Sequence, residues 1–208
     1  MRVLRTGRAA LLIECDAPTD VPAWYRSLLQ RRATGALHAD EIVPAAQTVL
    51  LDGVTDPARV AAELRTLRIT PAAELDPTAA GLVEIPTVYD GPDLDDVARL
   101  WHTDRAGVLA VHTGTLFTVA FCGFAPGFAY LTGLPERYHV PRRDSPRPRL
   151  AAGTVALAGE FGAVYPNASP GGWQCIGHTE IRLFDLDADP PTLLVPGTRV
   201  RFVPQAVR

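Results

Sequence analysis

The first eighty residues alternate between the hydrophobic pattern of a strand and that of a helix. Two apolar runs bounded by turn residues predict strands, and two stretches with apolar residues three or four positions apart predict helices. In chain order these elements are strand 8–15, helix 23–32, strand 41–53 and helix 58–67. Pro44 is expected to bend the second strand, because proline lacks the N–H that a strand ladder needs. Strands that alternate with helices indicate a small α/β unit.

The second half of the chain contains many short apolar runs separated by glycine and proline. Residues 93–102 predict a helix capped by Asp93, and a second short helical run follows it and ends near His112. The runs predicted as strands are 81–90, 115–124, 153–159, 173–177, 179–185 and 198–204. Many short strands joined by such turns indicate a barrel or a sandwich.

A segment rich in proline and alanine, residues 68–81, lies between these two patterns and predicts a linker. We therefore place a domain boundary near Gly81. The expected fold class is α/β followed by all-β, with a small domain over residues 1–81 and a β-rich domain over residues 82–208.

The composition narrows the possible chemistry. All 20 basic residues are arginine, which excludes a Schiff-base lysine, a Ser–Lys dyad and the lysine of a phosphate-binding loop. Neither GxxxxGK[ST] nor GxGxxG occurs in the sequence. The formal net charge of -3 argues against nucleic acid or an anionic membrane as the main partner.

The cysteines and histidines do not have the spacing of a metal site. Cys15, Cys122 and Cys175 are far apart and form no CxxC pair, so neither a zinc site nor a disulfide framework is predicted. The histidines show no i,i+4 pair and no HExxH motif. The apolar run at the N-terminus is too short to span a membrane. We expect a soluble cytoplasmic protein without a metal.

Two segments are candidates for a binding site. "FCGFAPGFAYL", residues 121–131, is rich in aromatic residues and glycine, and its Phe124, Phe128 and Tyr130 indicate either the wall of a groove or an aromatic-rich loop of the core. "PRRDSPRPRL", residues 141–150, holds four arginines between prolines and must be extended. Its guanidinium groups suit a carboxylate or phosphate clamp, and a solvated arginine-rich loop is the alternative. Ser169 lacks a GxSxG elbow and is read as a turn cap rather than a nucleophile.

These motifs together resemble a known family. The segments that carry the resemblance are VLAVHTGTLFTVAFCGFAPGFAYLTGLP, VPRRDSPRPRLAAGTVALAG, VYPNASPGGWQCIGHT and LLVPGTRVRFVP. In this order and spacing they are similar to the allophanate hydrolase subunit 1 family, which is also known as the family of 5-oxoprolinase B subunits or of Kip-type kinase inhibitors. The family corresponds to one half of the carboxyltransferase domain of urea carboxylase.

The resemblance implies a small N-terminal α/β domain followed by a C-terminal cyclophilin-like β-barrel. It implies a cytoplasmic protein that works with a C-type partner, similar to allophanate hydrolase subunit 2, and with a separate A-type partner. The implied activity is ATP-dependent opening of 5-oxoproline, a small lactam, to L-glutamate. The ATP site is expected to be shared with one of these partners or located on it, and the isolated chain is expected to be inactive.

The resemblance also suggests site residues. His112 is expected to be the polar contact or proton-transfer group, with capping of a helix end as its alternative, and Arg142 or Arg149 is expected to hold a carboxylate or phosphate. The expected substrate-binding residues are Phe124, Pro126, Gly127, Phe128, Tyr165, Ser169, Gly171, Gly172, Trp173, His178 and Thr179. Among these, the three aromatic residues Phe128, Tyr165 and Trp173 are expected to shape the wall.

The sequence departs from the family pattern at two places. The residues after Gly159 lack the usual Gln and Thr, so no role of those side chains can be transferred. His178 stands where the family usually has arginine. A permanent cation is thereby replaced by an imidazole, and anion binding at this position would weaken as pH rises above neutrality.

Three functions compete at this stage. The first is a subunit of an ATP-dependent 5-oxoprolinase, and the second is a carboxyltransferase-type subunit in urea or amide metabolism, whose biotin would have to come from another protein. The third is an inhibitor that docks on a sensor histidine kinase. Prolyl isomerisation would rest on fold analogy alone, and fold does not imply function.

Overall fold

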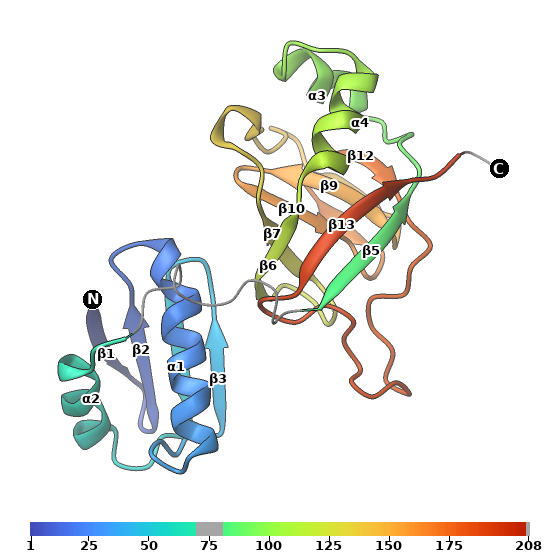
Figure 1. Ribbon diagram of the computed structural model, residues 1–208. Coiled ribbons are helices and arrows are strands. Elements are labelled where there is room, and N and C mark those ends of the chain that lie inside the picture. The colour runs from blue at the N-terminus through green and yellow to red at the C-terminus, as the bar shows by residue number, and fades with distance from the viewer. Residues whose placement is uncertain (70–80, 207–208) are drawn as a thin grey trace. The chain divides into compact units, whose positions relative to one another are not determined.

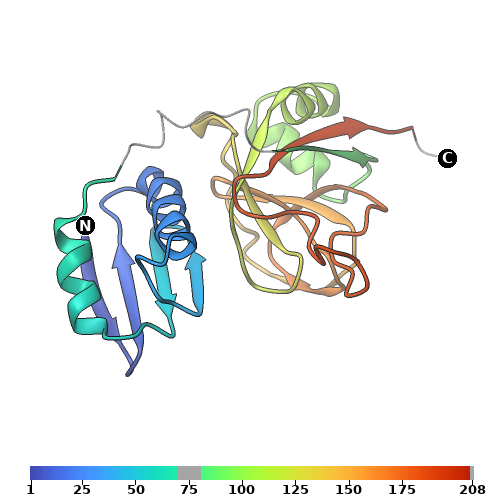
Figure 2. The ribbon, with the colours of Figure 1, turned by 60° about the horizontal axis from the view of Figure 1, so that its bottom comes forward.

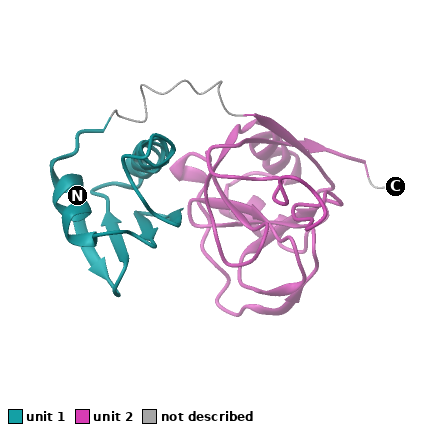
Figure 3. Ribbon diagram, turned by 90° about the horizontal axis from the view of Figure 1, so that it is seen from below, with its two compact units in different colours: residues 1–79 teal, residues 80–208 magenta. Residues whose placement is uncertain are grey.

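A computed structural model describes residues 1–69 and 81–206 of the chain. It divides into two compact units, residues 1–79 and 80–208, coloured teal and magenta in Figure 3. The linker predicted over residues 68–81 lies mostly outside the described residues. Each unit is described by itself below.

Unit 1 is a two-layer structure with a four-stranded antiparallel sheet in the order β1-β2-β4-β3. Its elements are β1 (Arg2–Thr6), β2 (Ala10–Glu14), α1 (Val21–Ala33), β3 (Glu41–Pro44), β4 (Thr48–Asp52) and α2 (Pro57–Thr66). Alternate residues of the central strands, such as Leu11 and Ile13, enter one core together with Leu28 of α1 and Leu64 of α2. Both helices therefore cover the same face of the sheet (Figure 1).

The helices and strand β2 were predicted, but residues 41–53 are not a single bent strand. The chain forms a hairpin there, in which Pro44 ends β3 and Ala45 N donates to Thr48 O at 2.8 Å. Pro44 and the turn that follows it end the strand instead of bending it. Strand β1 was missed, because Val3 is its only buried residue and the rest of the strand carries no alternating signal.

Unit 2 is built on a seven-stranded sheet in the order β12-β9-β10-β7-β6-β13-β5. Its strands are β5 (Leu82–Thr87), β6 (Phe117–Cys122), β7 (Ala129–Thr132), β9 (Thr154–Ala158), β10 (Phe161–Val164), β12 (Gln174–His178) and β13 (Arg199–Pro204). β5 and β13 run parallel, side by side in Figures 1 and 2. The two edges approach each other at Val88 and His178, whose backbones exchange two hydrogen bonds of 2.9 Å. The sheet is thus a nearly closed barrel.

Two short helices and a small second sheet complete unit 2. The helices are α3 (Leu94–Leu100) and α4 (Arg105–Gly114), and the second sheet pairs β8 (Arg147–Leu150) with β11 (Ser169–Gly171). Val97 of α3 and Val108 of α4 belong to the core that fills the barrel. The predicted combination of an α/β unit followed by a β-barrel is therefore confirmed. No helix in the described part of the chain is long and apolar enough to cross a membrane.

Two predictions about unit 2 were wrong. Residues 179–185 are not a strand, since only Phe184 makes an isolated bridge, to Thr192, although Leu183 is buried. The alternation of apolar and polar residues in this segment buries single side chains such as Leu183, but the backbone of the segment does not pair with a neighbouring strand. Asp93 does precede α3, but its side chain makes no capping hydrogen bond to the helix. It instead accepts hydrogen bonds from Arg143 and Arg147.

Candidate functional site

The structure brings the arginine–proline segment and the Ser-Pro-Gly-Gly loop together, although they are about twenty residues apart in the chain. Strands β8 and β11 pair antiparallel, with Leu150 opposite Ser169. Arg143 N donates to Gly172 O at 2.8 Å, and Gln174 Nε2 donates to Pro141 O at 3.1 Å. The two motifs singled out in the sequence therefore form one surface.

A cluster of buried aromatic side chains packs against this surface. Phe128, Tyr165 and Trp173 are all buried and meet edge to face, with ring centroids 5.3 to 6.5 Å apart. Burial raises the pKa of Tyr165 to about 12. A Cβ at Gly171 would lie 2.5 Å from the Tyr165 hydroxyl, so only glycine fits there. Of the aromatics in residues 121–131, Phe128 is therefore a core residue, and the expected role of Phe128, Tyr165 and Trp173 in the wall of a groove stays a prediction.

Phe124 differs from the other aromatics. Its side chain is 64% exposed, and its backbone has a left-handed φ of 70°, which is uncommon for a bulky residue. Its ring still touches Phe128 at a centroid distance of 5.2 Å. The following Gly127 has φ of 81°, and a Cβ there would lie 2.7 Å from the Cβ of Phe184. This loop therefore presents one aromatic ring to solvent.

The neighbouring Pro126 is exposed on the same loop. It and Phe124 are the two expected substrate-binding residues of this loop whose side chains solvent can reach, whereas Phe128 is buried. Their contact with a substrate stays a prediction.

Asp93 is the buried charge of unit 2, with 1% exposure. It accepts hydrogen bonds from Arg147 Nη1 and Nη2 at 2.8 and 2.7 Å, from Arg143 Nη1 at 2.6 Å and from Cys175 N at 2.7 Å. Burial raises its pKa, but these hydrogen bonds and the two guanidinium charges outweigh burial and hold the pKa below its usual range. We call this group, Asp93 with Arg143, Arg147 and the backbone of Cys175, the Asp93 anchor. It fixes the arginine–proline segment to α3 and β12.

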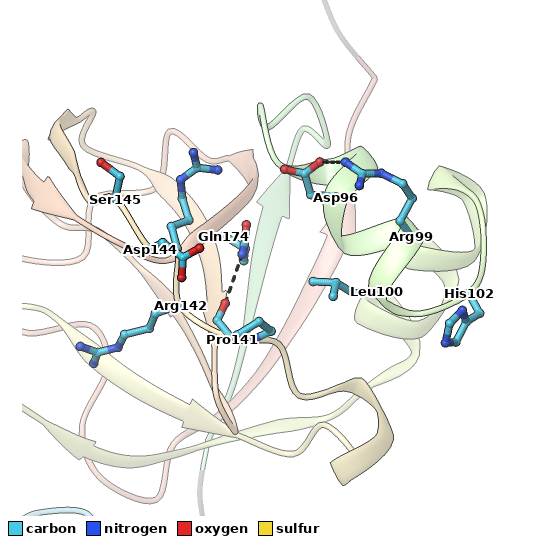
Figure 4. Close-up of a pocket in the computed structure, with 10 residues that line it drawn as sticks. Asp96, Arg99, Leu100, His102, Pro141, Arg142, Asp144, Ser145 and Gln174 are labelled. Carbon is cyan, nitrogen blue, oxygen red and sulfur yellow. Dashed lines mark hydrogen bonds and ion pairs between the residues drawn. The ribbon is translucent and has the colours of Figure 1, made fainter.

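Beside the anchor lies a cleft of about 670 Å³, a volume typical of small-molecule sites. Figure 4 shows it between the end of α3 and the segment from Pro141 to Ser145, with the Gln174 amide between them. Its lining residues are Asp96, Arg99, Leu100, His102, Pro141, Arg142, Arg143, Asp144, Ser145 and Gln174. A second hollow of about 470 Å³ continues past Arg142 to the turn at Gly159 and Glu160. Arg142 thus lies between two hollows.

The four arginines of the segment fall into two pairs. Arg143 and Arg147 are used by Asp93, whereas Arg142 and Arg149 are exposed and form no ion pair among the described residues. The Arg142 guanidinium lies 6.0 Å from the Trp173 ring. The two arginines expected to hold an anion are therefore the two that remain available, and that role stays a prediction.

His112 lies away from this surface, inside the barrel core. It is completely buried, its Nδ1 is 2.7 Å from the Tyr89 hydroxyl, and its ring packs on Phe117 and Phe202. Burial lowers the pKa of His112 to about 3, so the ring is neutral at physiological pH. His112 lines neither of the two hollows, and its proton-transfer role stays a prediction.

His178 and Thr179 occupy the place where the barrel closes. His178 is exposed, and its Nδ1 lies 2.8 Å from Asp90 Oδ1. Thr179 is buried and its hydroxyl accepts from Ile181 N at 3.2 Å. Ser169 Oγ is covered from water and has no hydrogen-bond partner among the described residues. Neither His178 nor Thr179 lines the two hollows.

Sequence reasoning missed Asp93 and Gln174 as parts of this region. The position of Asp93 before a helix favours capping, and only the fold reveals its arginine partners. Gln174 directly follows the Gly-Gly-Trp motif, which was the available signal. The described residues contain no group of His, Cys, Asp or Glu side chains that could hold a metal ion.

Comparison with known proteins gives the family. The family described as "Carboxyltransferase domain, subdomain C and D" matches residues 1–194. The chain is 40% identical over 205 residues to the 5-oxoprolinase B subunit of Escherichia coli O157:H7, covering 96% of this chain and 94% of that protein. It is 46% identical over 125 residues to the protein of the same name from Bacillus subtilis, covering 59% of this chain and 52% of that protein.

Solved structures agree on the fold. A conserved uncharacterized protein from Pyrococcus horikoshii, PH0987, is 33% identical with a TM-score of 0.59, and the match covers 98% of this chain and 97% of that one. TTHA0988 is 32% identical with a TM-score of 0.76, covering 96% of this chain and 40% of that longer chain. Kluyveromyces lactis urea carboxylase shares the fold at 19% identity, with a TM-score of 0.70 over 98% of this chain and 22% of that one. The resemblance stated from the motifs is confirmed.

Proposed function

Because the chain belongs to the carboxyltransferase domain, subdomain C and D, family, we propose that it is the B subunit of a 5-oxoprolinase. The observation that carries this proposal is the 40% identity to a 5-oxoprolinase B subunit along 94% of that protein's length. The second and third relatives carry the same name. None of the three names favours a urea carboxyltransferase or a kinase inhibitor.

The proposed reaction couples two hydrolyses. Opening of the lactam consumes one water and gives L-glutamate, and hydrolysis of ATP to ADP and phosphate consumes a second. A lactam carbonyl is a poor electrophile, and transfer of the γ-phosphoryl group of ATP to its oxygen, with ADP leaving, activates the carbonyl carbon. Addition of the first water and cleavage of the ring C–N bond then give an acyl phosphate, from which the second water releases phosphate and L-glutamate. The negative charge that develops on phosphoryl oxygens is stabilised by fixed guanidinium groups.

We propose that this chain supplies arginines to such a site and that partner subunits supply the rest. Arg142 and Arg149 are exposed cations without an ion pair in the described part of the chain. The chain has no lysine and no GxxxxGK[ST] loop, so a nucleotide would have to be held in another way, with groups of a partner. The proposed partners are one protein of the C type and one of the A type, and the isolated chain is expected to show no turnover.

The test is a coupled assay for L-glutamate and ADP formed from 5-oxoproline and ATP. It compares this chain alone, its partner subunits without it, and the complete mixture. We expect both products only in the complete mixture, in equal amounts. Turnover by the single chain would contradict the need for partners. Absence of turnover in a mixture whose complex is verified by gel filtration would contradict the proposed substrate.

A pair of matched variants links the activity to the exposed arginines. Arg149→Ala is expected to lower kcat/KM roughly 10- to 100-fold, the usual effect of losing a charge-assisted hydrogen bond. Arg201→Ala is the control, because Arg201 is also an exposed strand arginine and lies on β13, which belongs to a different sheet from β8. Equal effects of the two substitutions would show that Arg149 contributes only general charge.

A further inference from the structure

Two residues that line the cleft each carry a buried polar atom with no hydrogen-bond partner among the described residues. Gln174 Oε1 and Arg143 Nε are covered from water and make no hydrogen bond within the described residues. Both residues line the 670 Å³ cleft, and Gln174 is only 7% exposed. Buried polar atoms are almost always paired, so two such atoms on residues that line one cleft require an explanation.

The orientation of the Gln174 amide is fixed by its other end. Nε2 donates to Pro141 O at 3.1 Å, and a flipped amide would instead bring two oxygens together. Gln174 therefore presents an acceptor. Arg143 is equally fixed, because Nη1 is bonded to Asp93 at 2.6 Å and its backbone N to Gly172 O at 2.8 Å. Its Nε therefore presents a donor, held in place by the Asp93 anchor.

One acceptor and one donor match the edge of a cis amide. In a trans amide the N–H and the C=O point in opposite directions, whereas a small ring forces them onto the same edge. The charges add a second requirement. The arginines of the cleft and the anchor, 99, 142, 143 and 147, exceed the aspartates 93, 96 and 144 by one, since 4 − 3 = 1. The region is therefore suited to an anion.

Resting on the proposed function, we propose that this cleft binds 5-oxoproline itself, or another lactam with a carboxylate. Gln174 Oε1 accepts the ring N–H, Arg143 Nε donates to the ring carbonyl and Arg142 pairs with the carboxylate. The volume of about 670 Å³ exceeds what a five-membered ring needs and leaves room for a second reactant beside the carbonyl. Because Oε1 and Nε are covered from water, the proposed binding includes a rearrangement that uncovers these two atoms.

The test uses substrate analogues in the complete enzyme mixture, each lacking one recognition group. N-methyl-5-oxoproline lacks the N–H, and 2-pyrrolidinone lacks the carboxylate. Gln174→Ala is expected to raise the KM for 5-oxoproline roughly 3- to 10-fold and to leave the inhibition constant of the N-methyl analogue within about twofold. Arg142→Ala is expected to raise KM roughly 10- to 100-fold and to leave inhibition by 2-pyrrolidinone unchanged. Gln205→Ala and Arg201→Ala are matched exposed controls.

A variant that weakens 5-oxoproline but not the analogue lacking the matching group indicates direct contact between that side chain and the substrate. A purely structural role would weaken both ligands. If Gln174→Ala weakens 5-oxoproline and its N-methyl analogue equally, or changes neither, the assignment of the lactam edge is overturned while the turnover itself supports the proposed function. If the wild-type mixture shows no turnover, the proposed function fails and binding is then measured by ligand-observed NMR on the single chain. Binding of 5-oxoproline that both variants abolish and both controls keep would still support the cleft. If 5-oxoproline does not bind the single chain, the assignment of the cleft is overturned together with the proposed function.

Discussion

Two side chains of unit 2 are almost completely buried and could each titrate, but they are held in opposite ways. Asp93 stays charged, and four hydrogen bonds from two arginines and one backbone N–H surround it. His112 is neutral, and a single hydrogen bond to Tyr89 and the rings of Phe117 and Phe202 surround it. A buried charge persists only where several partners compensate its lost hydration, whereas a neutral ring needs few.

The difference separates a residue that shapes a site from one that fills a core. Asp93 joins segments that lie 50 to 82 residues apart in the chain, and one of its partners, Arg143, lines the cleft. His112 contacts the interior of the barrel and leaves its Nε2 without a partner among the described residues. Removing each side chain should therefore have different consequences.

The largest effect is expected from Asp93→Ala. Removal of one member of a buried ion pair leaves uncompensated charge, and here Arg143 and Arg147 would lose their common acceptor. We expect a loss of about 3–5 kcal/mol in the free energy of unfolding, measured by urea denaturation. Asp95→Ala is the matched control, because Asp95 lies two residues away and forms an exposed ion pair with Arg105. Similar losses in both variants would show that Asp93 is not an anchor.

A second, pH-dependent effect is expected from His112. Its pKa is lowered from 6.5 to about 3 by burial, so below pH 6.5 the unfolded chain binds a proton that the folded chain does not. The contribution of the neutral imidazole to the free energy of unfolding is fully present above pH 6.5. It falls by about 1.4 kcal/mol per pH unit as the pH drops from 6.5 towards 3. Asp93 behaves differently, because its lowered pKa stabilises the fold above the ordinary value of 3.8 and this contribution is lost only below that value.

The difference between wild type and His112→Gln isolates this window. Unfolding free energies of both proteins, measured from neutral pH down to about pH 4, should converge as the pH falls, because only the wild type loses the contribution of the imidazole. His102→Gln is the control, since His102 is exposed and its removal should leave the slope unchanged. A slope shared by all three proteins would mean that His112 is protonated in the folded state.

The sequence predicted those parts of the molecule that follow from local periodicity. Helices α1 and α2, most barrel strands and the extended arginine–proline segment carry their signal in residues a few positions apart. The segment 179–185 shows the limit, because its alternation places Leu183 in the core without a strand partner. The sequence predicted one strand for the region of hairpin β3–β4, because a proline occurs both at bends within strands and at strand ends. Pro44 alone does not distinguish these two cases.

The candidate site depended on contacts that no local pattern reveals. The Gly-Phe and Ser-Pro-Gly-Gly motifs lie together in the fold, since Phe128 and Trp173 meet edge to face, and substrate binding by this surface stays a prediction. Which arginines remain free could not be predicted, because Asp93 selects Arg143 and Arg147 across 50 and 54 residues of the chain. The burial of His112 was equally hidden, because a histidine at the end of a helical run is found both at surfaces and in cores.

The smallest effect is expected from His178, which pairs with a carboxylate as Asp93 pairs with arginines but does so in solvent. Its side chain is 46% exposed and that of Asp90 49%. Exposed pairs contribute about 0–1 kcal/mol and are screened by salt, so His178→Ala should lower the unfolding free energy by less than about 1 kcal/mol, and less still at roughly 1 M salt. The closure of the barrel at this residue uses backbone atoms, with His178 N donating to Val88 O, and alanine keeps that bond. His178→Pro removes the donor and is the informative contrast, since it should cost clearly more than His178→Ala in the same urea titration. Equal losses in the two variants would mean that the side chain, and not the backbone bridge, holds the two edges of the barrel together.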